Sequence, residues 1–115
     1  MATFNRENKA VVDDVLLGCA EVRLGKMFGF PAYYVGKKLC ICVYEQGVGV
    51  KLPAQSVIML LATDHNIVPF QPMGKPKMRE WIQVNLSCAE DFRHYMPVFD
   101  ESIRYVLAQQ TQGEV

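Results

Sequence analysis

The sequence has no excess of charge of either sign, because its 12 Lys and Arg residues are balanced by 12 Asp and Glu residues. Strong nonspecific affinity for nucleic acid or for an anionic membrane needs an excess of basic side chains. Long apolar runs are also missing: the longest, 39–44 and 57–62, have six residues each, whereas a membrane span needs about 20. The first residues lack the apolar core of a signal peptide. We therefore expect a cytoplasmic protein with no membrane partner.

Cysteines are few and form no recognisable framework. Cys40 and Cys42 lie two apart in an apolar run, so on a strand their side chains would point to the same face. This spacing is not that of a CxxC redox motif, and no second Cys or His pair lies at zinc-binding spacing. Cys19 and Cys88 stand alone. We predict that the four cysteines are small, reduced, buried apolar residues, and the alternative is a metal or redox site built from Cys40 and Cys42.

Catalytic signatures are also absent. The sequence has two histidines, His65 and His94, and neither has a nucleophile or metal ligand near it in sequence. The Gly-Val-Gly at 47–49 lies in a predicted hairpin rather than before a helix, so it is not a phosphate-binding loop. We expect no catalytic residues, no cofactor and no metal, and hence no enzyme.

The feature around which the chain is organised is an antiparallel meander over residues 26–52. Gly residues mark the turns at 36–37 and 45–47. The predicted strands are 28–35, 38–44 and 48–52. The middle strand is apolar on both faces, which is typical of a central, covered strand.

Helices and further strands surround this meander. Apolar periodicity predicts a helix over 4–18 that begins at Thr3 or Asn5 and ends at Gly18. A second helix follows Pro53 over 54–63, and five consecutive apolar residues at 57–61 indicate that it is covered over most of its circumference. Strands are expected at 67–71 and 78–86, with Trp81 on the face away from the main core.

The last helix is predicted to start at a capping box formed by Ser87 and Glu90 and to run to about residue 110, before a frayed tail. Pro97 should kink it near 93–97, or else a short helix ends there and a new one begins near Pro97. The result is a single domain over residues 1–115. Its predicted fold is α+β, a two-layer α/β sandwich of order α-β3-α-β2-α.

Short motifs are distributed over residues 10–110: Lys26-Met27-Phe28-Gly29, Gly36-Lys37, Val50-Lys51-Leu52, Gly74-Lys75-Pro76, Met78-Arg79-Glu80-Trp81 and Ser102-Ile103-x-Tyr105-Val106. Together they resemble the TfoX N-terminal domain family. Two features depart from it: Phe30-Pro31 replaces a second glycine, and Lys77 is an extra residue. The resemblance implies a small sandwich related to the secretion-chaperone and YjbR-like folds. Longer members of that family carry a second domain and regulate natural competence by assisting transcription.

Basic and aromatic residues in the turns and strands are the candidate contact residues. If the turns at 36–38 and 74–79 meet at one end of the sheet, they form a local positive patch that could bind nucleic acid by charge and stacking. The simpler interpretation is a set of solvated turn residues. The candidates are Tyr33, Tyr34, Lys37, Lys38, Lys75, Lys77, Arg79 and Trp81.

The sequence as a whole favours a non-enzymatic regulatory or interaction module that binds an unidentified protein, in line with the resemblance to the TfoX N-terminal domain. Exposed Tyr and Trp side chains would serve as anchors, since these residues are frequent in interfaces. The alternative is a nucleic-acid-binding domain that uses the basic end of the sheet. The oligomeric state stays open, a homodimer included.

Overall fold

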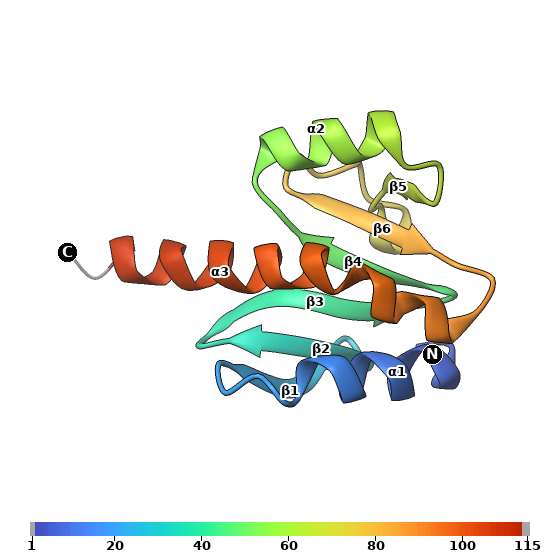
Figure 1. The fold of residues 1–115 in the computed structure, drawn as a ribbon, viewed down its shortest axis with the longest axis horizontal. Helices are drawn as coiled ribbons and strands as arrows, with labels where there is room; N and C mark the ends of the chain where they lie inside the picture. Colours follow the sequence, from blue (N-terminus) through green and yellow to red (C-terminus); the bar gives the residue numbers. More distant parts are fainter. Residues whose placement is uncertain (1, 114–115) are drawn as a thin grey trace.

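The protein folds into one open sheet of six antiparallel strands with three α-helices (Figure 1). The computed structural model describes residues 2–113. The strands lie in the order β1-β2-β3-β4-β6-β5. Their bounds are β1 Val22–Met27, β2 Phe30–Val35, β3 Lys38–Tyr44, β4 Gly47–Lys51, β5 Ile67–Pro69 and β6 Trp81–Asn85. The helices are α1 Arg6–Leu16, α2 Ala54–Thr63 and α3 Met96–Gly113, with short 3-10 helices η1 Pro72–Gly74 and η2 Ala89–Tyr95.

The helices are not distributed evenly over the sheet. Figure 1 shows α1 and α3 lying across one face, whereas α2 lies at the edge formed by β5 and β6. No helix within residues 2–113 is long and apolar enough to cross a membrane. The predicted α+β class with an antiparallel sheet is confirmed, but the element order is α-β4-α-β2-α, with one strand more than expected.

Both faces of the sheet are packed. The larger core lies between the sheet and helices α1 and α3, where Val12, Ile41 and Phe99 are fully buried. The smaller cluster, on the opposite face, includes Tyr44 and Phe70. None of the three α-helices in residues 2–113 covers this second face; Phe70 and the short helix η1 reach it from the segment that follows β5. The segment between β5 and β6 is therefore fixed by packing rather than by regular structure.

Residues 19–25, expected as a connector that enters the first strand near Glu21, lead into a separate strand, β1, that was not predicted. Residues 28–29, which were assigned to the first strand, form a turn instead. Phe28 and Gly29 both have positive φ, 51° and 88°, which is the geometry of a two-residue hairpin turn. β1 is an edge strand with mostly exposed side chains, including Arg23 and Lys26. Charged edge strands resist pairing with other chains, and for the same reason they lack the apolar signal by which a strand is recognised.

A β-bulge in β3 makes the predicted orientation of the two central cysteines wrong. Tyr33 pairs with Ile41 but Tyr34 pairs with Leu39, so Cys40 is the extra residue. A bulge resets the alternation of side chains. Cys40 accordingly packs beside Ile41 in the helix-side core, and Cys42 packs on the opposite face. Burial raises the pKa of each of these two thiols to about 12. Cys88 is exposed, so the prediction that all four cysteines are buried is wrong.

The first helix begins as predicted and ends differently. Asn5 is its N-cap, and its Oδ1 accepts a hydrogen bond of 3.0 Å from the Asn8 N–H. The expected termination by a left-handed Gly18 is wrong. The helix stops at Leu16, and the next residue, Leu17, keeps right-handed φ and ψ values.

The last helical region follows the alternative interpretation. The capping box does not form, because no side chain caps η2 and the Glu90 carboxylate pairs with Arg93 instead. After η2 a new helix, α3, begins at Met96, and Pro97 lies in its first turn, where a missing N–H costs nothing. α3 continues to Gly113, so the tail predicted from residue 111 begins as helix. Residues 114–115 lie outside the described part of the chain.

Candidate binding groove

Of the predicted contact residues, the two tyrosines lie on opposite faces of β2. Tyr33 is 0% exposed and its hydroxyl donates a 2.5 Å hydrogen bond to Asp13 Oδ1, so it belongs to the core and offers no contact surface. Burial, and the nearby Asp13, raise the pKa of Tyr33. Tyr34 is half-buried on the other face. Its hydroxyl donates to the Lys26 carbonyl, and the Arg23 guanidinium lies 5.3 Å from its ring centre.

The predicted basic end is divided into separate groups. Lys37 and Lys38 lie at the β2–β3 turn. Lys75 follows η1, where the Met73 N–H donates to the hydroxyl of Tyr44 at the opposite end of β3. Two more cations, Lys77 and Arg79, lie beside α2.

An acidic residue further divides these cations. Glu80 accepts a 2.7 Å hydrogen bond from the Tyr105 hydroxyl, and it lies 4.0 Å from the Lys51 ammonium. The turn at 36–38 and the segment 74–79 are separated along the sheet by β4, whose Lys51 lies beside Glu80.

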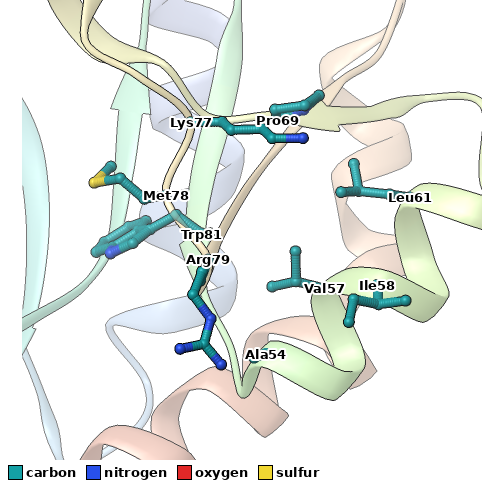
Figure 2. A pocket seen from close by; sticks show the side chains of 9 residues that line it. All are labelled: Ala54, Val57, Ile58, Leu61, Pro69, Lys77, Met78, Arg79 and Trp81. Carbon is teal, nitrogen blue, oxygen red and sulfur yellow. The ribbon is translucent and has the colours of Figure 1, made fainter.

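A groove of about 240 Å³ lies between α2 and the segment that leads into β6 (Figure 2). It is almost entirely apolar and has no acidic residue in its lining. The lining residues are Ala54, Val57, Ile58, Leu61, Pro69, Lys77, Met78, Arg79 and Trp81. It thus brings together three of the predicted contact residues, Lys77, Arg79 and Trp81, with a helix that was not expected to contribute.

Helix α2 forms one wall of the groove. Its ten residues, Ala54–Thr63, include no charged side chain. Val57 is buried against the sheet, but Ile58 is 67% exposed and Met59 is 60% exposed. The expectation that this helix is covered over most of its circumference is therefore wrong. Because α2 lies at the edge of the sheet, only one of its faces meets the rest of the chain (Figure 1).

The exposed face of α2 has a regular spacing. Gln55, Ile58, Met59 and Ala62 are all exposed, and they follow the i, i+3, i+4, i+7 pattern by which one helix packs on another. Three of these four side chains are apolar. A surface helix normally shows polar residues at such positions, so this stripe has the composition of a helix face that packs against another surface.

The opposite wall is held by packing and by backbone hydrogen bonds. Trp81 lies on the face away from the helices, as predicted, with its ring centre 5.5 Å from that of Phe70. The Leu52 N–H donates to the Glu80 carbonyl at 2.8 Å, and the Trp81 N–H donates to the Met78 carbonyl at 3.3 Å. These contacts fix the turn that carries Lys77 and Arg79, so the groove is preformed.

Two cations border the apolar surface. In Figure 2 the Lys77 side chain extends past Pro69 and the Arg79 guanidinium lies toward Ala54. Within the described part of the chain, neither cation forms an ion pair or a side-chain hydrogen bond. Both residues are exposed. The groove is therefore an apolar surface with two positive charges at its border.

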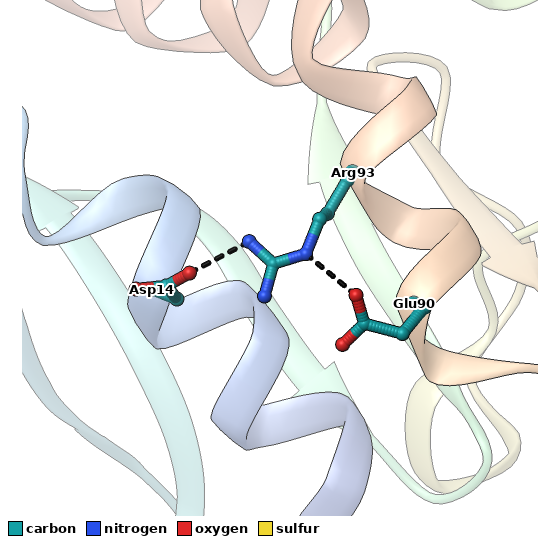
Figure 3. A network of polar contacts seen from close by, with 3 residues as sticks. All are labelled: Asp14, Glu90 and Arg93. Atoms are coloured by element: carbon teal, nitrogen blue, oxygen red, sulfur yellow. Dashed lines mark hydrogen bonds and ion pairs between the residues drawn. The ribbon is translucent and has the colours of Figure 1, made fainter.

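Other polar clusters serve as links between elements. Figure 3 shows Arg93 on η2 bound to Asp14 on α1 at 2.6 Å and to Glu90 at 2.8 Å. The hydrogen bonds to Glu90 and Asp14 raise the pKa of Arg93. All three side chains are substantially exposed to solvent, so this network joins two helical segments at the surface without forming a pocket.

A second, open depression contains the only tyrosine–carboxylate pair near a histidine among residues 2–113. The Tyr95 hydroxyl donates a 2.7 Å hydrogen bond to Asp64 Oδ2, and burial together with that carboxylate raises the pKa of Tyr95. His94 lines the same depression but is exposed. No group of three or more potential metal ligands occurs in the described residues. The arrangement provides no activated nucleophile.

Comparisons with protein-family models, with curated proteins and with solved structures found no match to this chain. The groove therefore has to be interpreted from its own chemistry. One sequence signal marked it, namely a ten-residue helix without charge. That signal indicated an apolar helix but not which of its faces is buried.

Proposed function

We propose that this protein is a non-enzymatic interaction module that binds another protein through the groove beside α2. The observation that carries the proposal is the uncharged helix α2, which exposes Ile58 and Met59 next to a preformed apolar groove. Contiguous exposed apolar surface on a small domain is typical of interaction sites. The separation of Lys37 and Lys38 from Lys77 and Arg79 favours this function over nucleic-acid binding.

The motif resemblance to the TfoX N-terminal domain family, including a related small-sandwich fold, extends the proposal to a regulatory role linked to transcription or competence. The α-β4-α-β2-α order and the antiparallel sheet are compatible with such a domain. In this proposal the module acts by contact with a protein of the regulatory machinery rather than by reading DNA itself.

The test is site-specific photo-cross-linking in nuclease-treated cell extract. A photoreactive amino acid replaces Met59, on the exposed face of α2 beside the groove, and in a control protein it replaces Leu17, an exposed apolar residue on the other side of the fold. We expect a discrete protein adduct from position 59 only. The adduct should disappear when Ile58→Asp is added, while circular dichroism shows that the variant is folded.

Nucleic acid binding is tested in parallel by titration with random-sequence DNA at low salt. Micromolar or tighter binding that weakens steeply with salt would overturn the protein-partner proposal. That conclusion would require the loss of binding in a variant with Ala at Lys37, Lys38, Lys75 and Lys77. Equal cross-linking from positions 59 and 17 would also contradict the proposal.

A further inference from the structure

The proposed function leaves the chemistry of the partner open, and the groove itself limits it. We propose that the groove binds an acidic amphipathic α-helix of a protein partner, with apolar residues on one face and carboxylates beside them. This inference rests on the proposed function and specifies its partner. It follows from the length of the groove, from the pattern on α2 and from the charges at the border.

The length of the groove sets the size of the bound segment. Its α2 wall runs from Ala54 to Leu61, which at 1.5 Å per residue is about 10 Å, or about two helical turns. A partner helix that follows this wall presents apolar side chains from about two to three turns.

The pattern on the surface favours a helix over an added strand. Strand addition needs an exposed sheet edge, and the neighbouring edge strand β5 has three residues and ends in Pro69, which lacks an N–H to donate. The exposed stripe of α2, in contrast, forms a ridge of the kind that packs between the side chains of a second helix. Its apolar members are Ile58, Met59 and Ala62, and Ile58 also lines the groove.

The charges at the border specify an acidic partner. Lys77 and Arg79 have no carboxylate partner in the described residues, and the lining between them is aliphatic. The α2 of a second copy carries no charge itself, and the carboxylate beside it, that of Glu101, already accepts a hydrogen bond from Ser56. A nucleic acid would place its phosphates and sugars against the apolar side chains of Val57 and Leu61. These polar groups would lose water without gaining hydrogen bonds.

The experiment uses two fluorescein-labelled synthetic peptides of 14 residues with leucines at i, i+3, i+4 and i+7. One peptide has glutamates at the flanking positions, and in the other these are lysines. Fluorescence anisotropy measures the affinity of the full chain for each. The test variant is K77E/R79E. The matched control is K37E/K38E, which makes the same change of charge at the β2–β3 turn, away from the groove.

We expect the wild-type protein to bind the glutamate peptide at least 10-fold more tightly than the lysine peptide. K77E/R79E should reverse this preference, and K37E/K38E should retain it to within a factor of about two. Ile58→Gln with Met59→Gln should weaken the glutamate peptide at least 10-fold. Circular dichroism and thermal melting confirm that each variant is folded.

Equal affinity for the two peptides, no binding of either, or equal effects of the two charge reversals would each overturn the inference. These outcomes are separate from failure of the proposed function. If Met59 still cross-links to a protein while the glutamate peptide does not bind, the module binds a partner of another chemistry. If both experiments are negative, the groove is not a protein-binding site.

Discussion

At the scale of single residues, two glycines have little or no room for a side chain. Gly36 occupies the β2–β3 turn with φ of +62°, and a Cβ there would collide with Oε1 of Gln110. Gly49 lies beneath Phe70 on β4, and a Cβ would lie 2.9 Å from the Cζ of that ring. The first glycine is needed for its backbone conformation and the second for space.

Three Gly→Ala variants separate these causes. Gly36→Ala should destabilise the protein by about 2 kcal/mol, since a left-handed alanine costs about 1–2 kcal/mol and Gln110 must release the Val35 carbonyl, which its Nε2 now binds at 2.6 Å. Gly74 has a positive φ but open space around it, so Gly74→Ala should lower the free energy of unfolding by about 1 kcal/mol. Gly18→Ala has neither limit and should change stability by less than about 0.5 kcal/mol.

Urea unfolding followed by circular dichroism measures all three variants under one set of conditions. The order Gly36, Gly74, Gly18 in decreasing cost is the prediction. A Gly36→Ala protein as stable as the Gly18→Ala protein would show that the turn does not require a left-handed residue.

Gly49 and Phe70 should be coupled, because the ring lies directly over the glycine. Gly49→Ala alone should cost about 1–3 kcal/mol through overpacking, and it should also loosen the wall of the groove that Trp81 and Phe70 hold. Adding Phe70→Leu should recover part of that cost. A double-mutant cycle with an interaction energy near zero would contradict the contact.

At the scale of elements, strand β3 and helix α2 both depart from their simple patterns. The bulge at Cys40 sends two consecutive side chains into the helix-side core, and Cys42 to the other face. The two thiols are therefore separated by the sheet and have no shared site for a metal ion. α2 is buried on a single face because it packs at the sheet edge rather than over its centre.

Alkylation of the native protein tests the cysteine arrangement. With iodoacetamide at pH 8, we expect rapid labelling of Cys88, which is exposed, and none of Cys40 or Cys42, which are 0% exposed. Mass spectrometry of the peptides measures the labelling. Stoichiometric zinc in the purified protein, lost in C40A/C42A, would instead show a metal site that joins these two residues.

At the scale of the whole molecule, the stability of the fold should depend on alkaline pH. Burial raises the pKa of Cys40 and Cys42 from 9.0 to about 12, so both thiols stay protonated in the folded state while they ionise in the unfolded chain. Their contribution to stability is complete below pH 9 and is lost as the pH rises toward 12. Between pH 9 and 12, each thiol should lower the free energy of unfolding by up to about 1.4 kcal/mol for each unit by which the pH rises.

Urea unfolding at pH 8, 9, 10 and 11 measures this dependence. C40A/C42A should show a shallower fall than the wild-type protein over the same range. The pKa of Tyr33 is also raised by burial, so Tyr33 contributes to the alkaline decrease in the free energy of unfolding in both proteins. Parallel curves for the wild type and the variant would contradict the assignment of the alkaline loss to the two thiols.

Local rules were sufficient for much of this fold. A continuous apolar run predicted β3, and glycine-marked turns delimited β4. The alternation of apolar residues predicted β6, because a half-buried strand repeats every two residues. Thr3 or Asn5 was predicted as a helix cap, and Gly36 as a left-handed turn residue; the structure has Asn5 as the cap and a positive φ at Gly36. These features depend on interactions between residues that are close in the sequence, so a short stretch of sequence is enough to predict them.

Tertiary structure decided the features that depend on residues far apart in the chain. The edge strand β1 is held by pairing with β2, and Cys40 is turned by a mismatch of register between β2 and β3. The groove exists because α2, residues 77–79 and β5 meet at one edge of the sheet. The apolar sequence of α2 indicated burial, but its position at the sheet edge left Ile58 and Met59 exposed, since burial is determined by what packs against a helix rather than by its own composition.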